Sequence, residues 1–257
     1  MRWGWLILTR LFSCEAYYKL VGMRIFIFAA LFLLSPVAIA QEADFSNPIQ
    51  TEASPVLVEL FSSQNCPACP PADAYMRVLS QSDGVIALSC HVDYFGGTKT
   101  HLEKKFCTNR QTRYIEQIGR KSHFTPQIMV NGHMSEIGYE EEKVSAAIVK
   151  ARSERVEKID IESKGKGVYN FTLAAQNLPK TAELWVAVYS QPVSFQGRGR
   201  TMVYYNTVSN LMKLGEWKGA AINRPVYPFI MPSSAGFAVF AQDIETGKVL
   251  AAGDYKL

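Results

Sequence analysis

The hydrophobic periodicity of the chain changes near residues 153–156, and this change limits the folds that the chain can adopt. Before it, apolar runs alternate with stretches of helical spacing. Strands are predicted over 55–61, 85–94 and 127–130, and helices over 72–80, 102–118 and 140–152. A hairpin turn at Asn131-Gly132 predicts a further strand after 127–130, so the order is strand, helix, strand, helix, strand, strand and helix. After residue 155 the apolar residues alternate with a period of two, which predicts short antiparallel strands arranged as a small β-sandwich.

The N-terminal segment predicts export. From Met23 the chain reads MRIFIFAALFLLSPVAIA, with one arginine, a short apolar run and the small residues Ala38 and Ala40 around a cleavage site. The apolar run is shorter than the roughly 20 residues that span a bilayer. We therefore expect an N-terminal extension and signal peptide over 1–40, with Met23 as a candidate true start, and a linker over 41–55. The predicted location is periplasmic or secreted, with no stable membrane span after cleavage.

Removal of residues 1–40 changes both charge and cysteine content. It takes away four basic residues and one acidic residue, so the formal net charge falls from +4 to +1. A nearly neutral protein offers no electrostatic case for a nucleic-acid partner, and the basic residues between 98 and 121 are interpreted as a solvated helix face. Four cysteines remain, and an even number in an exported protein predicts disulfides.

Two of these cysteines lie in the stretch 58-VELFSSQNCPACPPAD-73. Cys66 and Cys69 follow a predicted buried strand and open a predicted helix, where unpaired backbone N–H groups stabilise a thiolate. We therefore predict that Cys66 attacks a substrate disulfide and that Cys69 resolves the mixed disulfide. Pro70 and Pro71 lack an N–H, which weakens this stabilisation.

A second motif, Thr125-Pro126, stands immediately before the strand predicted over 127–130. Together with the order of elements and the C-x-x-C at the first strand-to-helix junction, it resembles the thioredoxin fold. In that superfamily the proline is cis, lies against the cysteine pair and leaves the preceding backbone free to pair with a substrate. The resemblance therefore implies that Thr125 and Pro126 bind substrate.

The chain also resembles a family of secreted bacterial proteins of unknown function that have a thioredoxin-like domain. The resemblance rests on C-P-A-C-P-P-A-D, on C-H-V-D-Y-F from Cys90 and on T-P-Q from Thr125. With the periodicity, it predicts an α/β thioredoxin-like N-terminal domain over 56–153, followed by a mainly antiparallel β-sandwich-like C-terminal domain over 154–257. The family brings a fold but no established reaction.

Glu59, Cys90 and Cys107 are further candidate residues. Glu59 is an isolated carboxylate in the first predicted strand, one residue further from the first cysteine than the buried acid of thioredoxins. It is a candidate base for Cys69, and the alternative is a carboxylate that accepts hydrogen bonds from loop amides. Cys90 and Cys107 are predicted to form a structural disulfide, with a second redox pair, free thiols or metal ligands as alternatives.

The sequence thus predicts an exported thiol-disulfide oxidoreductase that acts on protein thiols or disulfides, has no cofactor or metal, and works with a redox partner protein. Two alternatives stay open. One is a non-enzymatic secreted binding or scaffold protein in which Cys66 and Cys69 form a permanent disulfide. The other is zinc or copper binding or delivery through these cysteines and a histidine. The candidate histidines are His91, His101, His123 and His133.

Overall fold

The computed structural model describes residues 54–95, 101–178, 180–197 and 200–257. The predicted signal peptide and nearly all of the predicted linker lie outside the described residues. The described residues belong to one compact unit. None of the described helices combines the length and the apolar character that crossing a membrane requires.

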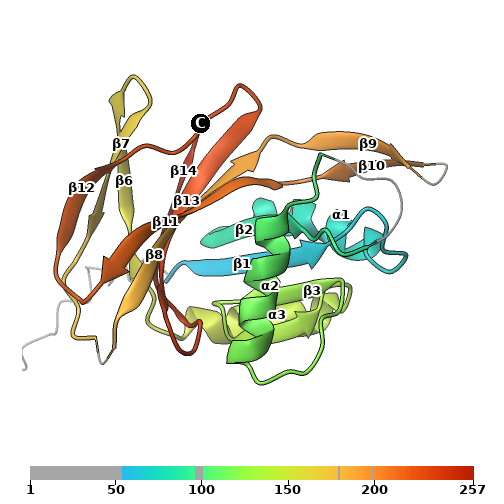
Figure 1. Ribbon diagram of the computed structural model, residues 1–257, viewed down its shortest axis with the longest axis horizontal. Helices are drawn as coiled ribbons and strands as arrows, with labels where there is room; N and C mark the ends of the chain where they lie inside the picture. The colour runs from blue at the N-terminus through green and yellow to red at the C-terminus, as the bar shows by residue number, and fades with distance from the viewer. Residues whose placement is uncertain (1–53, 96–100, 179, 198–199) are drawn as a thin grey trace, which may run out of the picture. The chain divides into compact units, whose positions relative to one another are not determined.

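A four-stranded sheet is built from the first half of the described chain (Figure 1). Its strand order is β2-β1-β3-β4, with β1 Val56–Ser62, β2 Val85–His91, β3 Gln127–Val130 and β4 Met134–Ile137. β1 and β2 are parallel, whereas β3 runs antiparallel to both β1 and β4. The predicted turn between β3 and β4 is confirmed, because Asn131 and Gly132 have φ angles of 44° and 73°, as a tight hairpin turn requires.

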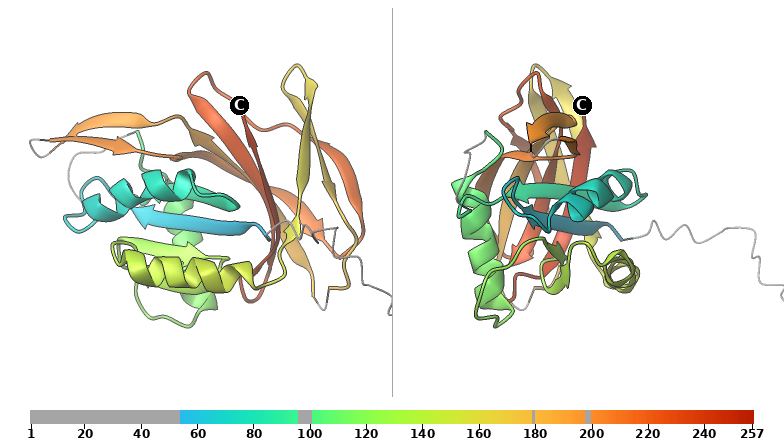
Figure 2. Two further views of the ribbon diagram at one scale, coloured as in Figure 1. Left: turned by 180° about the vertical axis from the view of Figure 1, so that it is seen from behind. Right: turned by 90° about the vertical axis from the view of Figure 1, so that its right-hand side faces the viewer.

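Three helices cover this sheet, namely α1 Pro70–Ser80, α2 Lys105–Gln117 and α3 Glu141–Arg152. α2 lies on one face, and α1 and α3 lie on the other (Figure 2). Successive side chains of β1 point to opposite faces of the sheet. Because helices cover both faces, every residue of β1 is buried. Leu57 and Phe61 pack with Tyr114 of α2, while Val58 and Leu60 pack with α1. The predicted order of helices and strands in this region is confirmed.

The remaining strands form three further sheets. The five-stranded sheet has the order β11-β8-β13-β14-β5, with β5 Glu157–Lys158, β8 Ala182–Ser190, β11 Val208–Trp217, β13 Ser234–Asp243 and β14 Val249–Lys256. The three-stranded sheet has the order β12-β7-β6, with β6 Asp160–Gly165, β7 Val168–Leu173 and β12 Ile222–Val226. The two-stranded sheet pairs β9 Val193–Gly197 with β10 Arg200–Tyr204.

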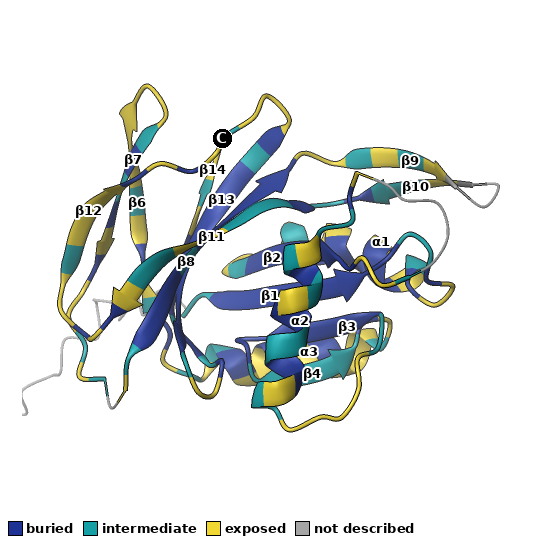
Figure 3. Cartoon of the chain, in the orientation of Figure 1, coloured by how far each residue is buried: buried dark blue, intermediate teal, exposed yellow. Residues whose placement is uncertain are grey.

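The predicted fold class is wrong. The described residues form fourteen strands in four sheets and only three short helices, so the protein is mainly β rather than an α/β thioredoxin-like domain followed by a β-sandwich-like domain. One hydrophobic cluster joins Leu57 and Phe61 of β1 to Ala238 and Phe240 of β13, and both strands are buried (Figure 3). A period of two predicts a strand but does not determine which sheet the strand joins. The domain boundary predicted at 153/154 falls between α3 and β5, and it stays a prediction that expression of 56–153 alone would test.

Candidate functional site

Cys66 and Cys69 lie in the turn that connects β1 to α1, and both are free thiols. The backbone N–H of Cys69 donates to the carbonyl of Cys66 at 3.4 Å, and that of Cys66 donates to Ser63 O at 3.1 Å. The two residues differ in depth, since Cys66 keeps 3% of its surface exposed and Cys69 keeps none. Pro67 and Ala68 between them are exposed, so the turn itself is at the surface. Both thiols are therefore buried, and Cys66 is the outer of the two.

The start of α1 explains how the two prolines are accommodated. Cys69 is the N-cap residue, and Pro70 and Pro71 occupy the first two helical positions, where an N–H has no intrahelical partner in any case. The first hydrogen bond of the helix runs from Asp73 N–H to Cys69 O at 3.0 Å. Because neither proline has an N–H, this helix offers fewer donors to a thiolate than an ordinary N-terminus would.

Thr125 and Pro126 lie beside Cys66. The peptide bond between them is cis, and the Thr125 carbonyl is 3.7 Å from Cys66 Sγ. Gln111 of α2 donates to the carbonyl of the preceding residue, Phe124, at 2.9 Å and so holds this loop. Thr125 Oγ1 is buried without a hydrogen-bond partner among the described residues. The predicted substrate-binding segment is therefore next to the outer cysteine.

Tyr94 is a further residue at this site that the sequence analysis did not select. It is 42% exposed, stacks on Phe95 and donates to Gln111 Oε1 at 3.0 Å. Its pKa is raised to about 12. Burial is the largest cause, the negative forms of Cys69 and Cys66 add to it, and the hydrogen bond to Gln111 acts in the opposite direction. Tyr94 is therefore close enough to the cysteines to contact a molecule bound there.

Glu59 lies on the other face of β1. It is buried and pairs with Arg110 of α2, with 2.5 Å between Arg110 Nε and Glu59 Oε1 and 2.8 Å for the second bond. Tyr114 also donates its hydroxyl to this carboxylate. Arg110 donates further to Gln242 of β13 at 2.9 Å. The predicted role of Glu59 as the base for Cys69 finds no support in this geometry, because the carboxylate is fully engaged on the face opposite α1.

The buried carboxylate on the cysteine side belongs to Asp73, which the sequence analysis missed. Asp73 is four residues after Cys69, which places the two on one face of α1. Its side chain is buried with 2% exposure, and burial raises its pKa to about 7. The signal was present in the sequence as C-P-P-A-D, a cysteine with an acid one helical turn later.

Cys90 and Cys107 form a disulfide, as the sequence analysis predicted. The bond joins the end of β2 to the first turn of α2, and both residues are buried in the cluster that contains Phe61 and Tyr114. It therefore lies on the α2 face of the sheet, with Glu59 and Arg110. Its burial supports a structural role.

The sequence matches one known protein family. Residues 57–242 match the family described as "Protein of unknown function (DUF1223)". The chain belongs to this family. The match covers both cysteine pairs, Thr125-Pro126 and most of the five-stranded sheet. The resemblance to a family of unknown function is thus confirmed, and the family description assigns no reaction.

Two solved structures resemble this DUF1223 chain. One is a crystal structure of an Agrobacterium tumefaciens protein solved by a structural-genomics consortium, which is 26% identical with a TM-score of 0.70, over 79% of this chain and 95% of that one. The other is HBP35 of Porphyromonas gingivalis, at 14% identity and a TM-score of 0.55, over 80% of this chain and 76% of that one. At this low identity HBP35 supports the fold alone. A search of curated proteins found no match.

The histidines of the DUF1223 chain lie apart from one another. His91 is fully buried, and burial lowers its pKa to about 4. His123 contacts Thr112 Oγ1 at 2.8 Å, His133 contacts Glu154, and His101 is exposed. Within the described ranges, no three His, Cys, Asp or Glu side chains come together in a group that would hold a metal ion.

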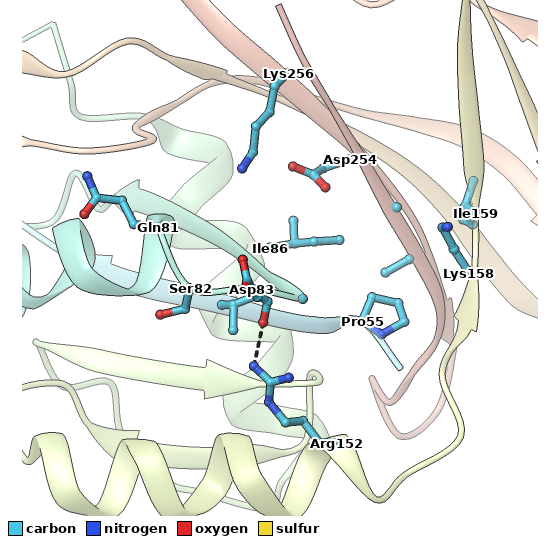
Figure 4. A pocket seen from close by; sticks show the side chains of 14 residues that line it. Pro55, Gln81, Ser82, Asp83, Ile86, Arg152, Lys158, Ile159, Asp254 and Lys256 are labelled. Carbon is cyan, nitrogen blue, oxygen red and sulfur yellow. Dashed lines mark hydrogen bonds between the residues drawn. The ribbon is translucent and has the colours of Figure 1, made fainter. Parts of the chain in front are cut away.

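A cavity of about 450 Å³ lies at the other end of β1, beside Pro55 (Figure 4). Arg152 reaches it from α3 and donates to the carbonyl of Asp83 at 2.6 Å. Asp254 and Lys256 of β14 border it as well. Because Cys66 follows the far end of β1 and neither cysteine lines the cavity, we assign the cavity no part in cysteine chemistry.

Proposed function

We propose that the protein exchanges thiols and disulfides with a protein substrate through Cys66 and Cys69. The observation that carries the proposal is the arrangement of the two free thiols, an outer one and a fully buried one, in a single turn at the surface. The two side chains are close enough for Cys66 to raise the pKa of Cys69. A pair in this arrangement suits attack by the outer sulfur and resolution by the inner one.

The exchange proceeds in two balanced steps. The Cys66 thiolate attacks one sulfur of the substrate disulfide, so a Cys66–substrate disulfide forms and the other substrate sulfur leaves as a thiolate. Cys69 then loses its proton and attacks Cys66 Sγ, which forms the Cys66–Cys69 disulfide and expels the second substrate thiolate. Two electrons pass from the protein to the substrate, and the reverse sequence delivers a disulfide.

Thr125 and Pro126 are proposed to hold the substrate. The contact between Thr125 O and Cys66 Sγ supports this role, because a chain bound along this loop would bring its own sulfur to Cys66. Tyr94 offers an exposed aromatic surface at the same place. We further propose that the protein works in the periplasm or outside the cell, where the Cys90–Cys107 disulfide is stable.

Equilibration of the protein from Gln41 to Leu257 with glutathione buffers tests the proposal. Thiols are trapped by alkylation, and the peptide with Cys66 and Cys69 is weighed by mass spectrometry. We expect a reversible two-electron transition with a potential between about −270 and −120 mV, and selective alkylation of Cys66 in the reduced protein. Cys66→Ser and Cys69→Ser serve as controls, since each removes the transition.

A non-enzymatic scaffold is the second candidate, and the low exposure of Cys66 favours it. In that case the two cysteines form a permanent disulfide that serves only the fold. The same titration separates the candidates, because a scaffold disulfide would stay closed in all the glutathione buffers. That outcome would overturn the proposed exchange.

A further inference from the structure

Asp73 is a buried acid that has no charged partner in the part of the chain that the structure describes. Its side chain is 2% exposed, and Asp73 Oδ1 has no hydrogen-bond partner among the described residues. Buried carboxylates are almost always paired or hydrogen-bonded, since an unpaired one costs free energy. The structure holds this acid one helical turn beyond the cysteine that must lose a proton.

Ser62 is a buried residue whose hydroxyl influences both the acid and the thiol. It is the last residue of β1 and is fully buried. Its Oγ atom has no hydrogen-bond partner among the described residues. Its hydroxyl is nevertheless close enough to both groups to lower the pKa of Cys69 and that of Asp73. A serine hydroxyl can accept a proton from one neighbour while it donates its own to another.

The pKa values of Cys69 and Asp73 determine which of them donates a proton and which accepts it. Burial, the bond with Cys66 and the charge of Asp73 raise the pKa of Cys69 to about 12, so this thiol stays protonated at neutral pH unless a base takes its proton. Burial raises the pKa of Asp73 to about 7, which suits a group that gains and loses a proton near neutrality.

We propose that Asp73 accepts the proton of Cys69, relayed by the Ser62 hydroxyl, when Cys69 attacks the mixed disulfide at Cys66. This inference rests on the proposed function. The Cys69 sulfur forms a bond to Cys66 Sγ, the bond between Cys66 and the substrate breaks, and its electron pair leaves with the substrate sulfur. The proton that Cys69 loses ends on the Asp73 carboxylate, and it returns by the same route when the reaction runs backwards.

Other titratable groups face this cluster, and none replaces Asp73. His91 of β2 is paired in register with Ser62, but it is neutral at physiological pH because burial lowers its pKa to about 4. Its ring packs on Tyr204 of β10. Tyr94, near the cysteines, has its pKa raised to about 12. On α1, Tyr75 is hydrogen-bonded to Ser145 of α3.

A two-phase reaction of the reduced protein from Gln41 to Leu257, which lacks Cys14, with dithiobis(nitrobenzoate) tests the relay. Cys66 releases one coloured thiolate when it is modified, and Cys69 releases the second when it attacks Cys66. Stopped-flow absorbance then reports the two steps separately, and Cys69→Ser identifies the second phase by removing it. We expect Asp73→Asn to slow the second phase about 100-fold, which is within the range of general acid–base catalysis.

The pH profile gives a readout that a purely structural role would not change. In the native protein the second phase should accelerate as pH rises through about 7, where Asp73 becomes a base. Asp73→Asn should lose this inflection, and Ser62→Ala should slow the second phase as well. Asp83→Asn, an exposed acid just beyond the same helix, should leave both phases unchanged.

The outcomes separate this inference from the proposed function. If the native protein shows no second phase, both the proposed function and the role of Asp73 are wrong. A native second phase whose rate and pH profile are the same in Asp73→Asn would overturn only the role of Asp73. An unchanged second phase in Ser62→Ala would overturn the relay through Ser62. Thermal unfolding of each variant shows whether a slow rate comes from a folded protein.

Discussion

Two buried polar clusters on opposite faces of the four-stranded sheet differ in how well their members are hydrogen-bonded. On the α2 face, Glu59 and Arg110 are paired with each other and with further polar side chains. On the α1 face, Ser62, Asp73 and His91 are just as deeply buried, yet each has an atom without a hydrogen-bond partner among the described residues. Satisfied networks specify and stabilise a fold, whereas unsatisfied titratable groups cluster at reactive sites. We infer that the α2 face serves stability and the α1 face serves chemistry.

The network on the α2 face connects three parts of the chain. Arg110 of α2 donates to Glu59 of β1, to Tyr114 at 2.7 Å and to Gln242 of β13 at 2.9 Å. Its guanidinium also lies over the ring of Phe240, 4.9 Å from the centroid. Burial lowers the pKa of Arg110, but Glu59 and Tyr114 outweigh this effect, and the pKa ends above its usual value. Arg110 therefore stays charged at physiological pH.

Arg110→Met should have the largest effect on stability. Methionine keeps most of the apolar volume but leaves the Glu59 carboxylate buried without its cation. Removal of one partner of a buried ion pair costs about 3–5 kcal/mol, so we expect the free energy of unfolding to fall by this amount. Urea unfolding at neutral pH, followed by tryptophan fluorescence, measures it.

A second substitution shows whether the unpaired charge is the cause. Glu59→Gln in the Arg110→Met background removes the charge and keeps an acceptor for Tyr114, so part of the loss should be recovered. A loss from Arg110→Met of about 1 kcal/mol or less, the range of exposed ion pairs, would contradict the importance of this network.

The sequence predicts the local elements well because helix and strand periodicities are local. The helices at 72–80 and 140–152 and the Asn131-Gly132 turn follow from short-range patterns. The Cys90–Cys107 disulfide follows from the cysteine count and the predicted export. Residues 201–208 show the opposite case, since their short-range pattern does not indicate that residues 201–204 belong to β10 and Val208 to β11, in different sheets.

The polar groups of the two faces could not be predicted, because each depends on contacts far apart in the chain. Arg110 was interpreted as part of a solvated basic face, and its burial follows only from β13 packing against α2. Glu59 is a candidate base by resemblance to the buried acid of thioredoxins, and the sequence does not reveal its partner Arg110, which is 51 residues away. Asp73 was overlooked because an acid in the first turn of a helix is commonly an exposed dipole partner. Its burial is visible only once Ser62 and α1 are packed together.

Asp73→Asn should stabilise the protein, with an effect that depends on pH. The folded-state pKa of about 7 lies above the usual aspartate value of 3.8, so folding favours the protonated acid. Native stability therefore falls as pH rises from about 4 to about 7, by at most about 4 kcal/mol. Asparagine removes this penalty, so the variant should exceed the native protein by about 2–4 kcal/mol above pH 7 and match it near pH 4.

Urea unfolding of both proteins at several pH values measures this difference. His91 also titrates, since its lowered pKa causes stability to be lost as pH falls toward about 4. That contribution is common to both proteins and cancels in the difference. A variant less stable than the native protein at high pH would mean that the Asp73 carboxylate has a partner that supports the fold. A variant that is more stable but slower in exchange would show stability given up for function.

The double substitution Cys90→Ala and Cys107→Ala tests whether the α2 face serves stability alone. Its expected effect on the free energy of unfolding is smaller. The disulfide closes a loop with a sequence separation of 17 residues, and in the chain-entropy model such a loop contributes about 3 kcal/mol. We expect the free energy of unfolding to fall by about this amount. Because the bond lies on the α2 face, the kinetics of Cys66 and Cys69 should stay unchanged at temperatures where the variant is folded. Slower exchange in a folded variant would show that Cys90 and Cys107 take part in electron transfer. The cysteine pairs would then form one relay, and the assignment of stability to one face and chemistry to the other would be wrong.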